Sequence, residues 1–151
     1  MTQACSGTVI TPWGRLMLIV GGRGLRRVIF DGPEGAALSG PWADAFLAYL
    51  RGQPFPPALP VDLADLPPFT RRVLEACRTI PFGETRSYRE LAAMAGNPRA
   101  AQAVGQALAR NPTPVAIPCH RVIGADGRLA GFTGGLTWKR ALLAHEGIEI
   151  G

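Results

Sequence analysis

Short apolar runs separated by turn sequences open the chain. The runs that have the length of strands are residues 8–10, 16–20 and 25–30. Between them, Pro12-Trp13-Gly14 and the glycine-rich residues 21–24 favour tight turns. Large apolar side chains then recur at helical spacing over residues 42–50, and Gly52 follows as a helix stop. The pattern predicts a small β-meander capped by one helix.

A proline-rich stretch follows the predicted meander and helix. Four prolines stand between Gln53 and Pro60. Because proline lacks a backbone N–H and has a fixed φ, this stretch cannot be helical and favours an extended connector. We predict an N-terminal α/β domain over residues 1–52, a proline-rich linker over residues 53–66 and a second domain over residues 67–151.

The apolar periodicity of the second domain is mostly helical. A helix is predicted over residues 70–78, with Cys77 on its apolar stripe, so we expect Cys77 to belong to the core. The apolar residues 115–117 have the length of a short buried strand. A last helix is predicted over residues 137–146, with Gly147 as its stop.

Two further helices are marked by their end signals. Ser87 and Glu90 form a capping box that opens a short helix ending at Gly96. Asn97-Pro98 supplies the cap and first turn of the next helix, predicted to run to about Arg110. Two helices joined by a tight turn indicate a helix-turn-helix, so the second domain is predicted to be mostly α and winged-helix-like.

Gly105 lies in the middle of the second of these helices, which is otherwise rich in alanine. A glycine there costs about 1 kcal/mol relative to alanine and therefore needs a reason. Close approach of DNA or of another backbone is one explanation, and tight packing against a neighbouring helix is the other. The sequence leaves both open.

The distribution of charge along the chain indicates which class of partner it binds. The net charge is +5, and residues 71–140 carry eleven basic and four acidic side chains. Such a basic segment suits a polyanion such as DNA.

With 47% hydrophobic and 18% charged residues the chain does not have the composition of a disordered protein. No apolar run approaches the ~18 residues of a membrane helix and no secretory signal is visible, so we predict a cytoplasmic protein without membrane contact.

The three cysteines, Cys5, Cys77 and Cys119, are widely spaced. This spacing fits neither a disulfide scaffold nor a zinc site, so we predict free thiols, no metal and no cofactor.

Cys119 is the candidate nucleophile because His120 and Arg121 follow it directly. A nearby cation or histidine lowers the pKa of a thiol towards the reactive thiolate, and we expect an exposed sulfur next to an imidazole. Neighbouring residues of a strand face opposite ways, so a turn is required for the two side chains to meet. Glu146, near the end of the last helix, is a candidate for orienting the histidine; an exposed glutamate is the alternative.

The segment Pro118–Val122 closely resembles the active-site motif of the O6-alkylguanine-DNA alkyltransferases. The resemblance covers nearly the whole chain. Its other motifs are Phe69-Thr70, Ser87-Tyr88, Gly96-Asn97-Pro98, Asn111-Pro112, Gly134-Gly135 and residues 142–147.

The resemblance implies a monomer whose helix-turn-helix enters the minor groove of double-stranded DNA and flips the damaged nucleotide. Cys119 would then take an alkyl group from O6 of guanine once only, with O4 of thymine left open as a substrate atom. His120 would take the thiol proton through a water, and Glu146 would orient the imidazole. Tyr88 would protonate guanine N3, and Asn111 would brace the turn before the cysteine.

The remaining implied roles are contacts. Those with the base are Leu108, Val122, Phe132 and Thr133. Those with DNA are Tyr88, Arg99, Ala100, Ala101, Gln102, Gly105 and Arg121. Two positions depart from the family: Gln102 replaces an arginine that fills the vacated base stack, and Phe132 stands where tyrosine is common.

Three other functions would each account for part of the sequence. A relative that binds alkylated DNA without repairing it would lack Cys119. A thiol hydrolase using Cys119 and His120 would need neither a helix-turn-helix nor a basic face. A transcription regulator would not require a Pro-Cys-His-Arg turn.

Overall fold

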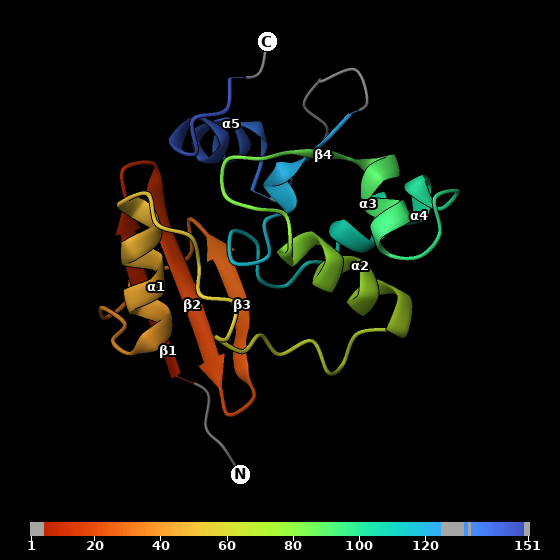
Figure 1. Cartoon of the computed structure of the whole chain (residues 1–151). Helices are drawn as coiled ribbons and strands as arrows, with labels where there is room; N and C mark the ends of the chain where they lie inside the picture. The colour runs from red at the N-terminus through yellow and green to blue at the C-terminus, as the bar shows by residue number, and fades with distance from the viewer. Residues whose placement is uncertain (1–4, 125–131, 133, 150–151) are drawn as a thin grey trace. The chain divides into compact units, whose positions relative to one another are not determined.

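The computed structural model describes residues 5–124, 132 and 134–149. The chain divides into two compact units, Met1–Asp65 and Leu66–Gly151 (Figure 1). Within the described residues no helix is long and apolar enough to cross a membrane.

The first unit is a three-stranded antiparallel sheet with one helix. Its strands are β1 (Cys5–Thr11), β2 (Gly14–Gly21) and β3 (Gly24–Phe30), paired in that order. The predicted meander is therefore confirmed. Helix α1 (Pro41–Leu50) packs on the sheet with its large aromatic side chains buried. The largest buried side chains of this core are Leu18, Leu25, Phe46 and Tyr49.

Both edges of this sheet are covered by neighbouring backbone. Beside β1, the N–H of Thr8 donates to the carbonyl of Ala36 at 2.8 Å. Beside β3, the N–H of Leu25 donates to Pro60 O at 3.0 Å, and the N–H of Asp62 donates to Leu25 O at 2.8 Å. Part of the segment predicted as a linker thus hydrogen-bonds to β3.

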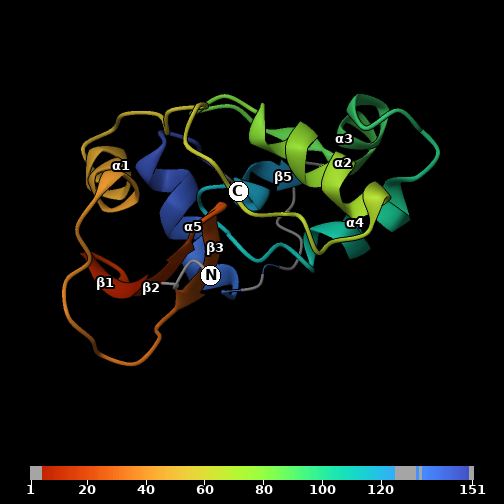
Figure 2. The same ribbon diagram turned by 90° about the horizontal axis from the view of Figure 1, so that it is seen from below.

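The second unit is built around helices α2 (Pro68–Arg78), α3 (Tyr88–Met94) and α4 (Ala101–Leu108), which lie side by side in Figure 2. Cys77 is fully buried on α2, as predicted from its stripe. The side chains that share this core are Val73, Leu74, Leu91 and Val104.

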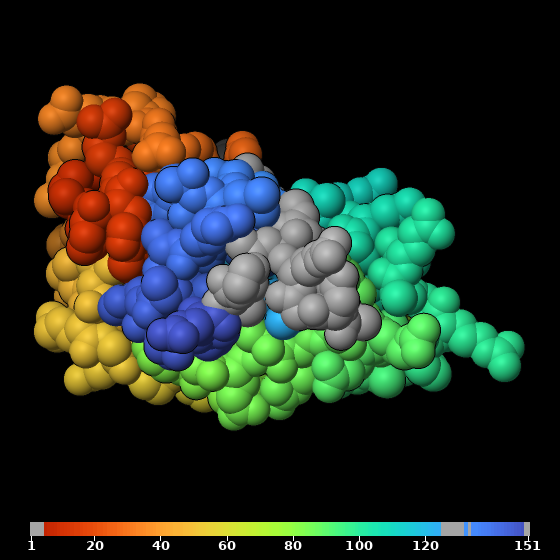
Figure 3. Space-filling view, turned by 90° about the horizontal axis from the view of Figure 1, so that it is seen from above, coloured from red at the N-terminus to blue at the C-terminus, as the bar shows by residue number. Residues whose placement is uncertain are grey.

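The turn between α3 and α4 has the predicted helix-turn-helix signals. Ser87 Oγ accepts from Glu90 N at 3.0 Å and Glu90 Oε1 accepts from Ser87 N at 2.9 Å, which completes the capping box. Gly96 has a φ of +101°, a conformation that favours glycine. Residues of this turn are exposed, and the segment projects from the surface in Figure 3.

Helix α4 is shorter than predicted at both ends. At its start, Asn97 Oδ1 accepts from Arg99 N at 3.1 Å, so the asparagine holds a turn and the helix begins only at Ala101. At its end, α4 stops at Leu108, because Pro112 and the residues before it turn towards the buried segment.

The predicted strand over residues 115–117 is wrong. Residues 114–117 form a buried turn in which Val115 has a φ of +75° and Ile117 N donates to Thr113 O at 2.9 Å. A strand cannot form there because the backbone reverses within four residues.

Three short elements and a last helix complete this unit. The 3-10 helix η1 (Cys119–Arg121) follows the turn, and β5 (Val122–Ile123) pairs in parallel with β4 (Arg86–Ser87). Helix α5 (Leu136–His145) ends before Gly147, whose φ is +81°, as the stop signal predicted.

Candidate functional site

Cys119 is the first residue of η1 and is buried, with 7% of its surface exposed. The amide Nδ2 of Asn111 donates to Cys119 Sγ at 3.2 Å and to Ile117 O at 3.0 Å. Asn111 Oδ1 accepts from Thr113 N at 3.0 Å. One buried amide therefore holds both ends of the turn that presents the sulfur.

The expectation of an exposed sulfur is wrong, because Cys119 is buried. Burial raises the pKa of Cys119 to about 11, although the hydrogen bond from Asn111 and the charge of Lys139 act in the opposite direction. Removal from water destabilises the thiolate more than these two neighbours stabilise it. The thiol is therefore protonated at neutral pH, and a base is required to activate it.

His120 is fully buried, and its Nε2 lies 2.6 Å from Glu146 Oε2. Burial lowers the pKa of His120 below 6.5, despite the opposite effect of Glu146, so the imidazole is neutral at pH 7. A neutral ring whose Nε2–H donates to a carboxylate has an acceptor lone pair on Nδ1. That Nδ1 has no hydrogen-bond partner among the residues that the structure describes.

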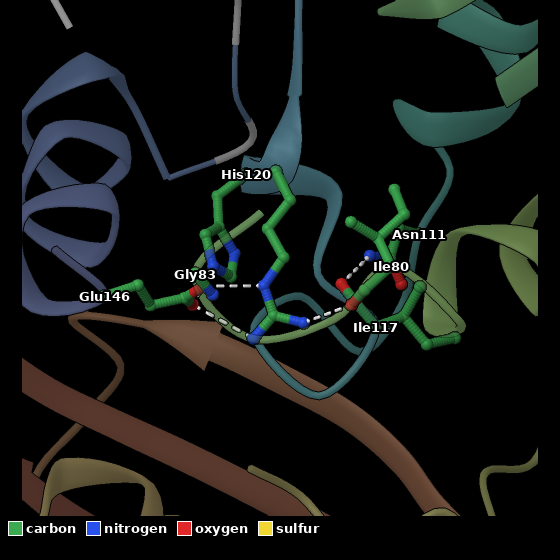
Figure 4. A network of polar contacts seen from close by, with 7 residues as sticks. Ile80, Gly83, Asn111, Ile117, His120 and Glu146 are labelled. Carbon is green, nitrogen blue, oxygen red and sulfur yellow. Dashed lines mark hydrogen bonds and ion pairs between the residues drawn. The ribbon is translucent and has the colours of Figure 1, made fainter. Parts of the chain in front are cut away.

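Glu146 is the centre of a buried polar network (Figure 4). Burial opposes its ionisation, but hydrogen bonds from His120 and Arg121 outweigh this effect and hold the pKa of the carboxyl well below its usual range. Gly83 N also donates to Oε1 at 3.0 Å. The alternative of an exposed glutamate is thereby excluded.

Arg121 was predicted to contact DNA, but the structure places its guanidinium in the same buried network. Its Nε donates to Glu146 Oε1 at 2.7 Å and its Nη2 donates to Oε2 at 3.0 Å. Its Nη1 donates to Ile80 O at 2.7 Å, and only 5% of the residue is exposed. All three nitrogens of the guanidinium donate inside the protein, where its charge balances that of Glu146.

Tyr88 opens α3 and is partly exposed. Burial, and then the neighbouring Cys119, raise the pKa of its hydroxyl, which keeps its proton at neutral pH. A Cβ at Gly105 would lie 3.8 Å from the Tyr88 ring, which is ordinary van der Waals contact. Packing within the described structure therefore does not require glycine at position 105, and the explanation by tight helix packing fails.

The predicted base contacts are only partly brought together. Val122 is fully buried and therefore offers no side-chain surface to a ligand. Leu108 is also buried, with 7% of its surface exposed. Phe132 is partly exposed, and its ring centroid lies 6.4 Å from that of His120, edge to face. Thr133 lies outside the described residues.

The predicted DNA contacts on and before α4 share an accessible surface. Arg99 and Gln102 are exposed, whereas three small residues beside them are partly exposed. These small residues are Ala100, Ala101 and Gly105.

Lys139 was missed by sequence reasoning, which counted it only as a positive charge. It is the single lysine of a chain with fifteen arginines, and that contrast was the available signal. Lys139 is fully buried on α5, and its Nζ donates to Val122 O at 2.8 Å. Among the described residues no cluster of three or more His, Cys, Asp or Glu side chains is placed to hold a metal ion.

Comparisons with known proteins identify the family of the chain. Residues 68–148 match the family model described as 6-O-methylguanine DNA methyltransferase, DNA binding domain. The human methylated-DNA–protein-cysteine methyltransferase is 43% identical over 126 residues, 82% of this chain and 61% of the human protein. The Mycobacterium tuberculosis protein of the same name is 47% identical over 114 residues, 76% of this chain and 68% of its own length. The match thus spans less than two thirds of the human relative.

Solved structures give the same result for the fold. The M. tuberculosis OGT in complex with DNA has a TM-score of 0.83 and 40% identity, covering 94% of this chain and 92% of that one. The O6-methylguanine-DNA methyltransferase of Pyrococcus kodakaraensis has a TM-score of 0.71 at 20% identity, covering 97% of this chain and all of that one. The predicted fold class is confirmed.

Proposed function

Because the chain belongs to the O6-methylguanine-DNA methyltransferase family, we propose that it repairs DNA by moving an alkyl group from O6 of guanine to its own Cys119. One observation carries this proposal. Cys119 and His120 occupy the same 3-10 turn, and the imidazole is held through Nε2 by Glu146, which leaves Nδ1 able to accept a proton. A cysteine activated by an oriented histidine is the arrangement that nucleophilic catalysis needs.

The first step is removal of the thiol proton. His120 is neutral and can act as the base, taking the proton of Cys119 at Nδ1 through a bridging water. Glu146 then stabilises the imidazolium through the hydrogen bond at Nε2. Arg121 remains on the same carboxylate, which keeps Glu146 ionised throughout.

The second step is transfer of the alkyl group. The thiolate of Cys119 attacks the alkyl carbon, a carbon–sulfur bond forms and the bond from that carbon to O6 breaks. The electron pair passes into the purine, and the hydroxyl of Tyr88 donates a proton to N3, so that guanine leaves neutral. A thioether offers water no good leaving group, so each molecule acts once.

The nucleic-acid partner is double-stranded DNA, with α4 in the minor groove and the alkylated base turned out of the stack. The alkyl carbon must be open to in-line attack by sulfur, which a stacked base does not allow. Arg99, Gln102 and the small residues of α4 would face the duplex, and Leu108 and Phe132 would face the base. The smooth surface at Gly105 supports this placement, because the protein's own packing leaves room for a side chain there.

A DNA-side assay tests the proposal. A duplex carrying O6-methylguanine inside a restriction site that the lesion blocks is incubated with increasing protein and then digested. We expect cleavage to be restored in proportion to protein, up to one site per molecule, and not by Cys119→Ser. Cys5→Ser, a change at an exposed cysteine, is the matched control and should repair normally. Tight binding without restored cleavage would instead identify a non-repairing binder.

A further inference from the structure

Among the residues that the structure describes, Lys139 is the one buried cation of this unit that the proposed chemistry does not use. Fifteen of the sixteen basic Lys and Arg side chains in the sequence are arginine, and the remaining one is Lys139. It is also among the largest fully buried side chains. Burying an ammonium is unfavourable unless it is hydrogen-bonded and meets a negative charge.

Its position ties it to the turn that carries the nucleophile. Lys139 Nζ donates to the carbonyl of Val122 at 2.8 Å. Val122 directly follows η1, and its own N–H donates to the carbonyl of Cys119. The ammonium of α5 is therefore anchored one backbone hydrogen bond away from the residue whose sulfur reacts.

The other basic side chains of η1 do not supply a free positive charge to the sulfur. Arg121 is paired with Glu146 through two hydrogen bonds, and His120 is neutral until it takes a proton. Cys77 of α2 and Tyr88 of α3 also interact with Cys119, but burial raises the pKa of both, so neither is charged at neutral pH.

Lys139 and Cys119 shift each other's pKa in the directions expected for an ion pair. The charge of Lys139 lowers the pKa of the Cys119 thiol. Burial lowers the pKa of Lys139, and Cys119 raises it in return.

We propose that Lys139 is a positioning residue that supplies the positive charge stabilising the Cys119 thiolate. The inference rests on the proposed use of Cys119 as nucleophile. The thiol proton still goes to His120, and Lys139 keeps its own three protons while the sulfur becomes negative and then neutral again on alkylation. Lysine suits this position because its ammonium is a compact point charge, whereas the planar guanidinium of arginine needs a wider set of acceptors.

The first test measures the thiol directly, without DNA. Cys119 of the Cys5→Ser protein is alkylated with iodoacetamide across a range of pH, and the rate is followed by mass spectrometry of its peptide. We expect Lys139→Met to slow alkylation about tenfold at about pH 8, where the lysine is charged, and much less at about pH 11, where the lysine has lost its proton. Arg140→Met, an exposed change on the same helix, should leave the rate unchanged across the pH range. A purely structural lysine would lower the rate by the same factor at every pH, and that result would overturn the proposal.

The second test needs no variant of Lys139. Because the chain has one lysine, protein made with ¹³C-lysine gives a single ε-carbon resonance whose pH titration reports this residue alone. Converting Cys119 to its carbamidomethyl form removes the thiolate, with iodide as leaving group. Because the thiol titrates at about 11, close to the range of the lysine, we expect the lysine resonance of the unmodified protein to titrate in two coupled steps and that of the carbamidomethyl form in a single step at lower pH. Identical titration curves would overturn the proposal, whether or not the protein repairs DNA.

Discussion

His120 Nε2 lies 2.6 Å from Glu146 Oε2, and both side chains are fully buried although twenty-six residues separate them. This contact fixes the tautomer of the imidazole, because Nε2–H must point at the carboxylate. Arg121 and Gly83 hold the same carboxylate from other directions. Glu146 therefore joins the cysteine turn to the end of α5 and orients the base in one arrangement.

Glu146→Gln is expected to lower the free energy of unfolding by about 3–5 kcal/mol, because it leaves the guanidinium of Arg121 buried without a countercharge. Urea unfolding measures this change. Glu149→Gln, at an exposed position nearby, is the control and should change stability by less than about 0.5 kcal/mol. Equal small effects of the two substitutions would mean that the buried network contributes little to stability.

The same network predicts how stability depends on pH. The pKa of Glu146 is lowered from 4.5 and that of His120 from 6.5, so the unfolded chain binds more protons than the folded one in acid. The contribution of His120 is complete above pH 6.5 and decreases as the pH falls through its folded pKa; that of Glu146 decreases below pH 4.5. We expect the unfolding free energy of Glu146→Gln to depend less steeply on pH below 4.5 than that of the unaltered protein. Parallel curves would contradict the assignment.

Most of the fold could be predicted from patterns of residues that are close together in the sequence. The strands of the first unit, the capping box at Ser87 and the stop at Gly147 depend on residues close together in the sequence, and each was predicted from them. The core position of Cys77 followed from the apolar stripe of its own helix.

The errors concern long-range burial. From the sequence alone, Arg121 is expected to be a surface charge. Its burial depends on Ile80, forty-one residues earlier, whose carbonyl accepts the hydrogen bond from Nη1. The pKa of Cys119 depends on burial by distant segments, which a motif does not record. Residues 115–117 are apolar because they are buried in a turn, and apolarity alone cannot distinguish such a turn from a strand.

Asn111→Asp should slow alkylation of Cys119 by iodoacetamide about tenfold or more, since a hydrogen bond to a charged group contributes about 1.5–3 kcal/mol. The aspartate cannot donate to Sγ, and its charge repels the thiolate. Asn97→Asp is the matched control: Asn97 uses its side-chain oxygen as an acceptor, which aspartate retains. Similar rates for the two variants would show that the Asn111–Cys119 hydrogen bond does not matter to the sulfur.

Gly105→Ala is expected to have opposite effects on folding and on DNA binding. The added Cβ fits beside Tyr88, so α4 should gain about 1 kcal/mol of stability. Affinity for duplex DNA should fall, because the new methyl group separates the helix from the sugar–phosphate backbone. Thermal unfolding and fluorescence anisotropy measure the two effects. Undiminished affinity would contradict the placement of this face of α4 against DNA.

Gln102→Arg introduces the arginine that the family resemblance implies at the position that fills the vacated stack. We expect tighter binding, a salt dependence steeper by about one unit, and faster repair. Gln106→Arg adds the same charge one turn later on α4 and serves as the control. It should tighten binding without accelerating repair, and equal repair rates in both variants would show that the gain is electrostatic only.

The mass of the protein after reaction tests the central claim most directly. The chain is mixed with a slight excess of duplex containing one O6-methylguanine, and its intact mass and cysteine peptides are measured. We predict the gain of one methyl group, about 14 Da, located on Cys119 and absent from Cys5 and Cys77, with no gain in Cys119→Ser. An unmodified protein, or a methyl group on either other cysteine, would contradict the assignment of Cys119 as the acceptor.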